Sequence, residues 1–205
     1  CFYDKYRHFT STLNINAYLR SREDVVLSIN IIACVNKDGA LGYNGNLIYR
    51  FESDMSRFKE ITTKNEYGLK NICVMGLNTY KELDQPLLGR KNVVLTSQSQ
   101  DKFPKEVIVE RSLSKLINHY NSGFQEKELF ILGGQRVFEE TLELNCVDNI
   151  YLTVVHDDGV KADTYFPMNY LDEYFEVVHK QKFEVDGLRI DFIDYKRKTE
   201  KGNVG

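Results

Sequence analysis

From Ser28 onward, short runs of β-branched and aliphatic residues alternate with stretches that carry apolar residues at three- and four-residue spacing. Short runs that are apolar throughout suit strands buried on both faces, and the stretches between them suit amphipathic helices. This alternation is typical of parallel strands covered by helices. The sequence therefore predicts an α/β fold with a central, mostly parallel β-sheet flanked by helices.

The predicted elements follow directly from this pattern. Strands are expected at 28–35, 71–75, 92–96, 107–109, 128–132, 150–155, 175–183 and 189–195, and helices at 53–62, 76–83, 113–121 and 136–144. No helix separates the last two strands, so we expect an antiparallel hairpin at the C-terminal edge that turns at Asp186-Gly187. We assign 1–27 as an N-terminal extension, 28–198 as one domain and 199–205 as a polar tail.

Composition narrows the class of protein. The 205 residues include 42% hydrophobic and 28% charged residues, close to the average of a soluble globular domain. The net charge is −3 without a long basic run, and no window approaches the ~20 apolar residues of a membrane span, so we expect neither nucleic acid nor membrane as a partner. Cys1, Cys34, Cys73 and Cys146 lack C-x-x-C spacing. This pattern favours buried free thiols in a reducing compartment. We also expect a cytoplasmic location, a monomer as an isolated domain and no metal site.

Asp54 falls on the apolar side of the predicted helix at 53–62. Phe51, Met55, Phe58 and Ile61 form that side, and Asp54 lies within it. Burial disfavours a charged carboxylate while the positive end of the helix favours it, so such a group suits a ligand with paired N–H donors. The alternative is a structural aspartate that caps its own backbone or contacts a core hydroxyl.

Glycines mark three further segments. Three of them lie in 37–46, a connection long enough to be a lid or a plain flexible loop. Gly133-Gly134 joins a predicted strand to a helix, where backbone N–H groups suit a pyrophosphate, although a tight structural turn explains the pair equally well. Gly76 has a similar position. Arg90, just before a predicted strand, is either a carboxylate ligand or a solvated charge.

Nine segments of the sequence are informative as a set: Ile32-Ala33-Cys34, Leu41-Gly42, Asp54 with Phe58-Lys59, Val74-Met75-Gly76, Asn78-Thr79-Tyr80, 87–92, 132–138, Tyr151-Leu152-Thr153 and 163–167. A single segment carries little weight, whereas nine in order are specific. Their order and spacing resemble the dihydrofolate reductase family from about Ile29 to Lys198.

The resemblance implies roles for the substrate residues. Asp54 corresponds to the acid that binds N3 and the 2-amino group of the pterin, Thr153 supports it, and Tyr49 stands where the family usually has tryptophan; these are the three expected catalytic residues. Arg90 corresponds to the arginine that binds the α-carboxylate of the folate tail. The expected apolar pocket wall comprises Ile32, Leu47, Met55, Phe58, Leu83, Leu87 and Leu132.

The resemblance also implies NADPH as cofactor. Hydride would pass from the nicotinamide to C6 of the dihydropterin, with a proton added at N5. Leu77 departs from many relatives, which place there an arginine that pairs with the 2′-phosphate; Arg111 or Arg136 is expected to compensate. The expected cofactor contacts are Cys34, Ala40, Leu41, Gly42, Asn44, Asn46, Gly76, Asn78, Thr79, Thr96, Ser97, Arg111, Gly133, Gly134, Gln135, Arg136, Val137 and Phe138, and the segment from Ala40 to Asn46 is the expected mobile lid.

Two other functions remain open at this stage. One is a reductase of the riboflavin-pathway type on the same fold, against which the joint presence of Asp54 and Arg90 argues. The other is a non-catalytic relative that keeps the fold. The expected ligands are dihydrofolate and antifolate-type small molecules, and the chain is either a separate domain or the reductase part of a bifunctional chain with thymidylate synthase.

Overall fold

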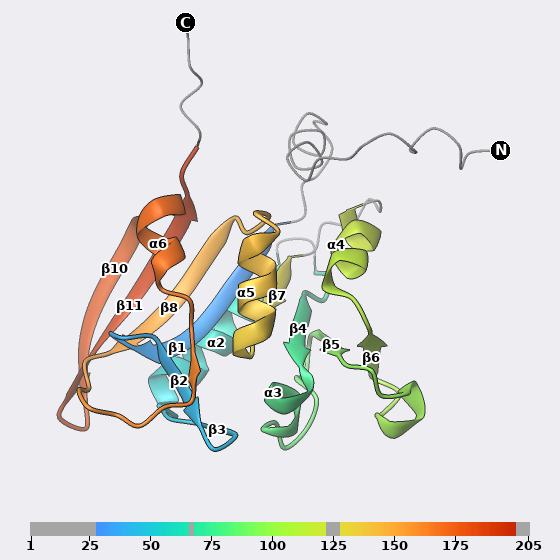
Figure 1. Ribbon diagram of the computed structural model, residues 1–205, viewed down its shortest axis with the longest axis horizontal. Coiled ribbons are helices and arrows are strands. Elements are labelled where there is room, and N and C mark those ends of the chain that lie inside the picture. Colours follow the sequence, from blue (N-terminus) through green and yellow to red (C-terminus); the bar gives the residue numbers. More distant parts are fainter. Residues whose placement is uncertain (1–27, 66–67, 122–127, 200–205) are drawn as a thin grey trace, which may run out of the picture.

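A computed structural model describes residues 28–65, 68–121 and 128–199 (Figure 1). The extension assigned to 1–27 and nearly all of the predicted tail therefore lie outside the described residues. The described part forms an eight-stranded sheet and a separate three-stranded sheet. Within the described residues, no helix is both long and apolar enough to cross a membrane.

The large sheet contains most of the expected strands within a residue or two of the predicted bounds. It consists of β1 (Ile29–Asn36), β4 (Ile72–Gly76), β5 (Lys91–Leu95), β6 (Val107–Glu110), β7 (Leu129–Ile131), β8 (Asn149–Val155), β10 (Phe175–Val185) and β11 (Leu188–Arg197). The small sheet consists of β2 (Ala40–Tyr43), β3 (Asn46–Leu47) and β9 (Thr164–Tyr165). The helices are α2 (Glu52–Thr63), α3 (Leu77–Lys81), α4 (Leu113–Asn121), α5 (Gln135–Glu143) and α6 (Asn169–Tyr174), with a 3₁₀ turn η1 (Gln100–Lys102).

The strand order confirms a mostly parallel sheet with an antiparallel edge. The order is β10-β11-β8-β1-β7-β4-β5-β6, in which β8, β1, β7, β4, β5 and β6 pair in parallel and β11 pairs antiparallel with both β8 and β10. The hairpin turns at Asp186-Gly187 as predicted, with φ of 52° and 75°. Two positive φ values give the type I′ turn that matches strand twist. At the edge, β10 has a register shift between Val177 and His179.

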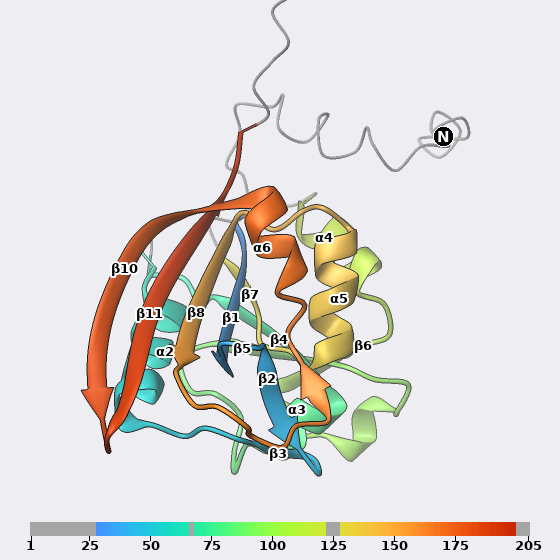
Figure 2. The ribbon, with the colours of Figure 1, turned by 60° about the vertical axis from the view of Figure 1, so that its left-hand side comes forward.

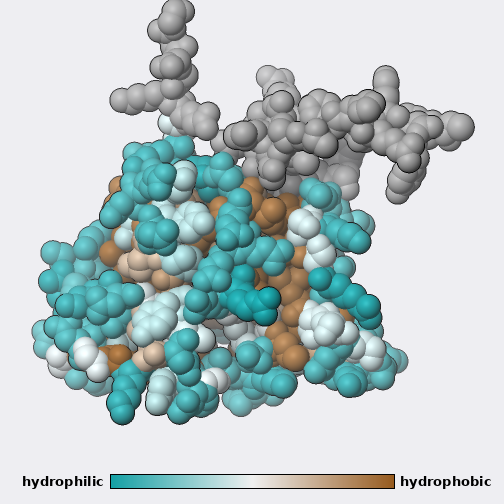
Figure 3. Space-filling model, viewed as in Figure 1, coloured by the Kyte–Doolittle hydropathy of each residue, from teal (hydrophilic) through white to brown (hydrophobic). Residues whose placement is uncertain are grey.

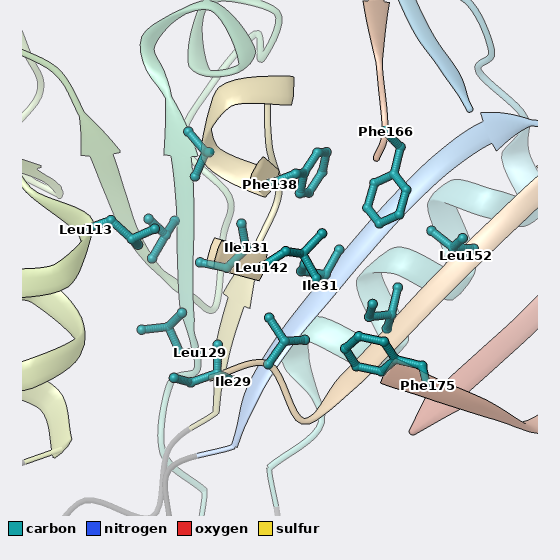
Figure 4. Close-up of a cluster of buried hydrophobic side chains, with 14 of the residues drawn as sticks. Ile29, Ile31, Leu113, Leu129, Ile131, Phe138, Leu142, Leu152, Phe166 and Phe175 are labelled. Atoms are coloured by element: carbon teal, nitrogen blue, oxygen red, sulfur yellow. The ribbon is translucent and has the colours of Figure 1, made fainter. Parts of the chain in front are cut away.

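Apolar side chains alternate between the two faces of the sheet. Ile29 and Ile31 of β1 join a cluster with α4, α5 and α6, seen in part in Figure 4, whereas Ile32 faces a second cluster that contains Phe58 and Ile61 of α2. Figures 1 and 2 show α2 on the opposite side of the sheet from α4, α5 and α6. Both faces of the sheet are therefore covered, as the uninterrupted apolar runs predicted.

Several elements differ from the prediction. The segment at 37–46, expected as an irregular connection, forms β2 and the first residue of β3. These two strands pair with each other, and β2 also pairs with β9. The helix expected at 76–83 is shorter, because Gly76 completes β4 and the helix ends at Lys81. The helix α6 was not predicted. Two-residue strands and six-residue helices are too short to show a period in the sequence.

Asn71 joins the end of α2 to the sheet. Its buried side-chain amide donates hydrogen bonds to the carbonyls of Thr62 (3.2 Å) and Lys64 (2.8 Å). Its carbonyl oxygen accepts from the Asn65 amide (2.8 Å) and from the Glu128 backbone N–H (3.2 Å). One side chain thus satisfies polar groups of three segments and fixes where α2 ends.

Asn71→Ala should lower the free energy of unfolding by about 2–4 kcal/mol, because it leaves several buried polar groups without partners. Urea denaturation followed by circular dichroism measures this loss. Asn169→Ala, at an exposed asparagine at the start of α6, is the control and should change stability by less than about 0.5 kcal/mol. Equal effects of the two substitutions would contradict this role of Asn71.

Candidate active site

A cavity of about 770 Å³ opens at the C-terminal ends of the parallel strands. Ligands in open parallel sheets commonly bind at this edge. In Figure 3, hydrophobic residues form a strip over β4 between hydrophilic surfaces. The cavity is lined by Leu41, Gly42, Gly45, Asn46, Leu47, Gly76, Leu77, Asn78, Thr79, Glu82, Leu95, Thr96, Ser97, Arg111, Leu132, Gly134, Gln135, Arg136, Val137, Phe138, Glu140 and Thr164.

Two glycine segments meet at the base of the cavity. The Gly76 N–H donates a hydrogen bond of 2.7 Å to the Gly133 carbonyl, and the Gly133–Gly134 peptide bond is cis. Gly133 has a φ of 102°, and a Cβ atom there would lie 2.8 Å from the Phe138 ring. Only glycine fits this position, because a side chain would be strained and would collide with the aromatic ring.

The small sheet forms one rim of the cavity. Buried Asn36 shapes its start, since its side-chain oxygen accepts from the backbone N–H groups of Asp38 (3.0 Å) and Ala40 (2.8 Å). Gln135 at the start of α5 accepts a 2.8 Å hydrogen bond from the Tyr165 N–H of β9. The rim is thus attached to the helix that closes the other side.

Polar and cationic residues line the wall opposite this rim. Thr96 and Ser97 follow β5, and Arg111 and Arg136 are exposed cations on the lining. The start of α5 also lines this space, and the first backbone N–H groups of a helix lack intrahelical partners, which favours an anion there. Leu77, at the start of α3, offers neither charge nor donor beside them.

Asp54 lies outside this lining, in the first turn of α2, and contacts β8. Its Oδ1 accepts a 2.5 Å hydrogen bond from the hydroxyl of fully buried Thr153. The helix has no side-chain cap at Phe51, so the capping alternative for Asp54 is not observed, whereas contact with a core hydroxyl is. Thr153 and Asp54 are 99 residues apart, and packing of α2 on the sheet brings them together.

Burial raises the pKa of Asp54, while the hydrogen bond from Thr153 and the positive charge of Arg57 act in the opposite direction. The net direction is upward. Burial, followed by the charge of Asp54, also raises the pKa of the Cys34 thiol on β1. Cys34 is therefore a neutral, half-buried neighbour of Asp54 rather than part of the cavity lining.

The expected apolar wall is mostly assembled between α2 and the sheet. Ile32, Phe58, Leu83, Leu87 and Leu132 share the second hydrophobic cluster, and Leu132 also lines the cavity, as does Leu47. The expectation that Met55 lies on the core-facing side of the helix was wrong: it is 52% exposed, because a residue adjacent to Asp54 points about 100° away around the helix. Its place in the pocket wall stays a prediction.

Arg90 is held beside α2 by three contacts. Its Nη1 donates to the Thr62 hydroxyl (2.9 Å), its Nε donates to the Leu88 carbonyl (3.0 Å), and its guanidinium lies 5.5 Å from the centre of the Phe58 ring. Burial lowers its pKa. No ion pair to Arg90 occurs among the described residues. The guanidinium of Arg90 is therefore an oriented cation beside the apolar wall, and it has further N–H groups available to bind a ligand.

Tyr49 is buried in a third cluster, away from the cavity lining. Its hydroxyl donates to Asp157 (3.5 Å), its ring stacks on Phe51, and Cys34 and Phe192 pack nearby. Its pKa is raised by burial and by the charge of Asp157. The hydroxyl expected beside the pterin is therefore directed toward the segment that follows β8.

Fourteen of the eighteen expected cofactor contacts line the cavity. Gly133 lies directly beneath it, whereas Cys34, Ala40 and Asn44 are outside the lining. The lining residues that were not expected are Glu82, Leu95, Glu140 and Thr164, while Gly45 belongs to the expected lid and Leu77 is the position that departs from relatives. Thr164 lies within 163–167, one of the nine segments that carry the resemblance. Nothing in the sequence around Glu82 indicated a role, because its carboxylate accepts a 2.9 Å hydrogen bond from the Leu47 N–H, 35 residues earlier in the chain.

Comparison with known proteins decides the family. The profile described as dihydrofolate reductase matches residues 28–197, which is most of the chain. The chain belongs to the dihydrofolate reductase family. Neither the riboflavin-pathway type nor a non-catalytic relative is favoured by this match. Enzymes of this family are oxidoreductases that use a nicotinamide cofactor.

Three similar proteins illustrate the relationship. The dihydrofolate reductase of Schistosoma mansoni is 32% identical over 186 residues, which cover 85% of this chain and 99% of the relative. That of Saccharomyces cerevisiae is 25% identical, covering 72% and 75%. The bifunctional dihydrofolate reductase-thymidylate synthase of Glycine max is 34% identical over 67% of this chain, which spans only 27% of that protein.

Asp54→Asn should stabilise the folded protein at neutral pH but not in acid. The folded-state pKa of Asp54 is raised, so below the unfolded-state pKa the carboxyl is protonated in both states and imposes no penalty. As the pH rises through the folded pKa, the parent must bury a charge and loses stability, while asparagine does not. Unfolding free energies measured by urea from acid to neutral pH should diverge in favour of the variant.

The control is Asp101→Asn, which alters an exposed carboxylate in η1. Its curve should run parallel to that of the parent. A stability difference for Asp54→Asn that is independent of pH would contradict the raised pKa.

Proposed function

We propose that this member of the dihydrofolate reductase family reduces 7,8-dihydrofolate to 5,6,7,8-tetrahydrofolate with NADPH. The observation that carries the proposal is the half-buried Asp54 carboxylate, held by Thr153 beside an apolar wall that continues into the cavity through Leu132. This arrangement suits a flat heterocycle with paired N–H donors at one end.

Asp54 binds and orients the pterin in this proposal. A carboxylate accepts hydrogen bonds from N3–H and the 2-amino group as a bidentate pair. Because burial raises its pKa, Asp54 attracts protons more strongly than an exposed aspartate and so favours a protonated pterin. Thr153 fixes the orientation of the carboxylate through its 2.5 Å hydrogen bond.

The other substrate residues bind the folate tail and form the apolar wall of the pocket. Arg90 binds the α-carboxylate of the folate tail, since its guanidinium is already oriented by Thr62 and Leu88 and retains further donors. Phe58 and Leu87 contact the apolar middle of the ligand. Tyr49 packs behind the pterin site, with its hydroxyl held by Asp157. These groups position the reactants and exclude water.

The cavity fits a dinucleotide. A Cβ atom at Gly76 would lie 3.4 Å from a Val137 methyl group and fill the space between β4 and α5. The α5 N-terminus with Thr79 and Thr96 provides donors for a pyrophosphate. When bound, the nicotinamide supplies a hydride for C6 of the pterin, while a proton reaches N5 from water. The segment from Ala40 to Asn46 covers this site, and its mobility remains a prediction.

NADPH rather than NADH is proposed because cations lie on the lining. Arg111 and Arg136 together with Ser97 are able to bind a 2′-phosphate. Leu77 makes no contribution to that charge, so the preference is narrower than in relatives that carry arginine there. In addition, we propose cytoplasmic location and a monomeric reductase domain. The free thiols of Cys34, Cys73 and Cys146 support a reducing compartment.

Asp54→Asn should lower kcat with dihydrofolate and NADPH by roughly 10²–10⁴-fold at neutral pH, the usual contribution of a positioned acid-base group. Absorbance at the NADPH band measures the turnover. Glu52→Gln is the matched control, since it removes an exposed carboxylate from the same helical turn. Near-parent turnover of Asp54→Asn with an unchanged circular dichroism spectrum would remove Asp54 from the mechanism.

Leu77→Arg should increase the preference for NADPH over NADH by about 1–2 kcal/mol, the scale of a partly exposed charge-assisted hydrogen bond. High salt should remove much of this gain. The measurement is kcat/KM for both cofactors at low and high ionic strength. Leu69→Arg adds the same charge at an exposed position outside the cavity and should leave the ratio unchanged.

If the parent already prefers NADPH by several orders of magnitude and Leu77→Arg has no effect, the 2′-phosphate does not bind beside residue 77. Arg111 and Arg136 would then be the residues to replace.

A further inference from the structure

Arg57 lies behind the Asp54 carboxylate, on the next turn of α2. Its side chain is only 12% exposed, and its guanidinium lies 4.7 Å from the centre of the Phe192 ring. Nη2 forms an ion pair with Asp194 of β11, a carboxylate that is 25% exposed. A largely buried ion pair is costly unless both partners have further interactions. Arg57 has such an interaction in front of it.

The second interaction of Arg57 is with Thr153. Its Nη1 donates a 3.5 Å hydrogen bond to the Thr153 hydroxyl oxygen, and that hydroxyl in turn contacts Asp54 at 2.5 Å. A guanidinium has no acceptor, so the Thr153 hydrogen cannot be directed toward Arg57. The hydroxyl must therefore donate to Asp54. A chain of contacts runs from Asp194 through Arg57 and Thr153 to the carboxylate.

We infer that the Arg57–Asp194 pair is a positioning device that sets the proton affinity of Asp54 and the direction of the Thr153 hydroxyl. This inference rests on the proposed function of Asp54. It assigns opposite electrostatic effects to the two partners. The cation of Arg57 stabilises the charged form of Asp54, and the anion of Asp194, which pairs with Arg57, partly cancels that cation.

Among the residues that the structure describes, Arg57 is the cation that acts on Asp54. Cys34 faces it from β1 as a neutral thiol, and Thr153 faces it from β8. Tyr151, also on β8, lies 6.0 Å from the Arg57 guanidinium, and burial raises its pKa, so it too is neutral at physiological pH. The Arg57 charge also lowers the pKa of Asp54 against the effect of burial. Changes to the ion pair should therefore be visible in the titration of Asp54.

The test is the titration of the Asp54 carboxyl carbon in the ligand-free protein, by NMR of aspartate labelled with ¹³C. The signal is assigned by its loss in Asp54→Asn. Arg57→Met should move the titration midpoint to higher pH, and Asp194→Asn should move it to lower pH, each by at least a few tenths of a unit. The pH profile of kcat/KM should move in the same two directions.

Two further variants separate charge from structure. Arg57→Lys keeps the cation and should hold the midpoint near that of the parent. If Arg57→Met fails to fold, Asp194→Asn carries the test, because its expected shift to lower pH has a sign of its own. Lys59→Met removes an exposed cation from the same helix and should have little effect. Shifts of the same sign in Arg57→Met and Asp194→Asn, or no shift in either, would overturn the inference.

Failure of this inference is distinguishable from failure of the proposed function. If Asp54→Asn retains full turnover, the role of Asp54 is wrong although the titration still reports on Arg57. If Asp54→Asn is inactive while the titration midpoint of Asp54 is unchanged in both Arg57→Met and Asp194→Asn, only the inference about Arg57 is wrong.

Discussion

Alternate residues of β1, β4 and β7 face opposite sides of the sheet, and both sets are apolar, so each face must be covered. α2 covers one face, while α4, α5 and α6 cover the other (Figures 1 and 2). Parallel strands also bring their C-terminal ends to the same edge. The location of the site follows from this constraint, because packing α2 on the sheet brings Asp54 to Thr153 and leaves the cavity at the strand ends.

Elements with a long, regular pattern were predictable from the sequence. The apolar runs identified the sheet strands, and Asp186-Gly187 identified the hairpin turn, because both signals are local. The small sheet was missed, since its strands pair residues such as Gly42 and Thr164 that are far apart in the chain. The exposure of Met55 was not predicted, because a three- and four-residue spacing does not distinguish the centre of an apolar stripe from its margin.

The parts of the site that rest on sequence motifs were predictable, whereas contacts between residues far apart in the chain were not. Asp54, Thr153 and the glycine pair were identified by the family resemblance, yet the ion pair behind them joins Arg57 to a residue 137 positions later. Nothing in either local sequence predicts that contact. Burial raises the pKa of Asp54, since a charged carboxylate is unfavourable at this position. The fold is therefore less stable with Asp54 than it would be with an apolar side chain in its place.

The hairpin leaves β10 as the outer strand of the sheet, with an eleven-residue edge of mostly exposed side chains. An edge of that length presents unpaired backbone groups that would template addition of another chain. The register shift between Val177 and His179 interrupts the edge, and Lys180 and Lys182 place charge along it. Features of this kind disfavour pairing of a sheet edge with a further strand, so the hairpin that completes the sheet also carries them on its outer strand.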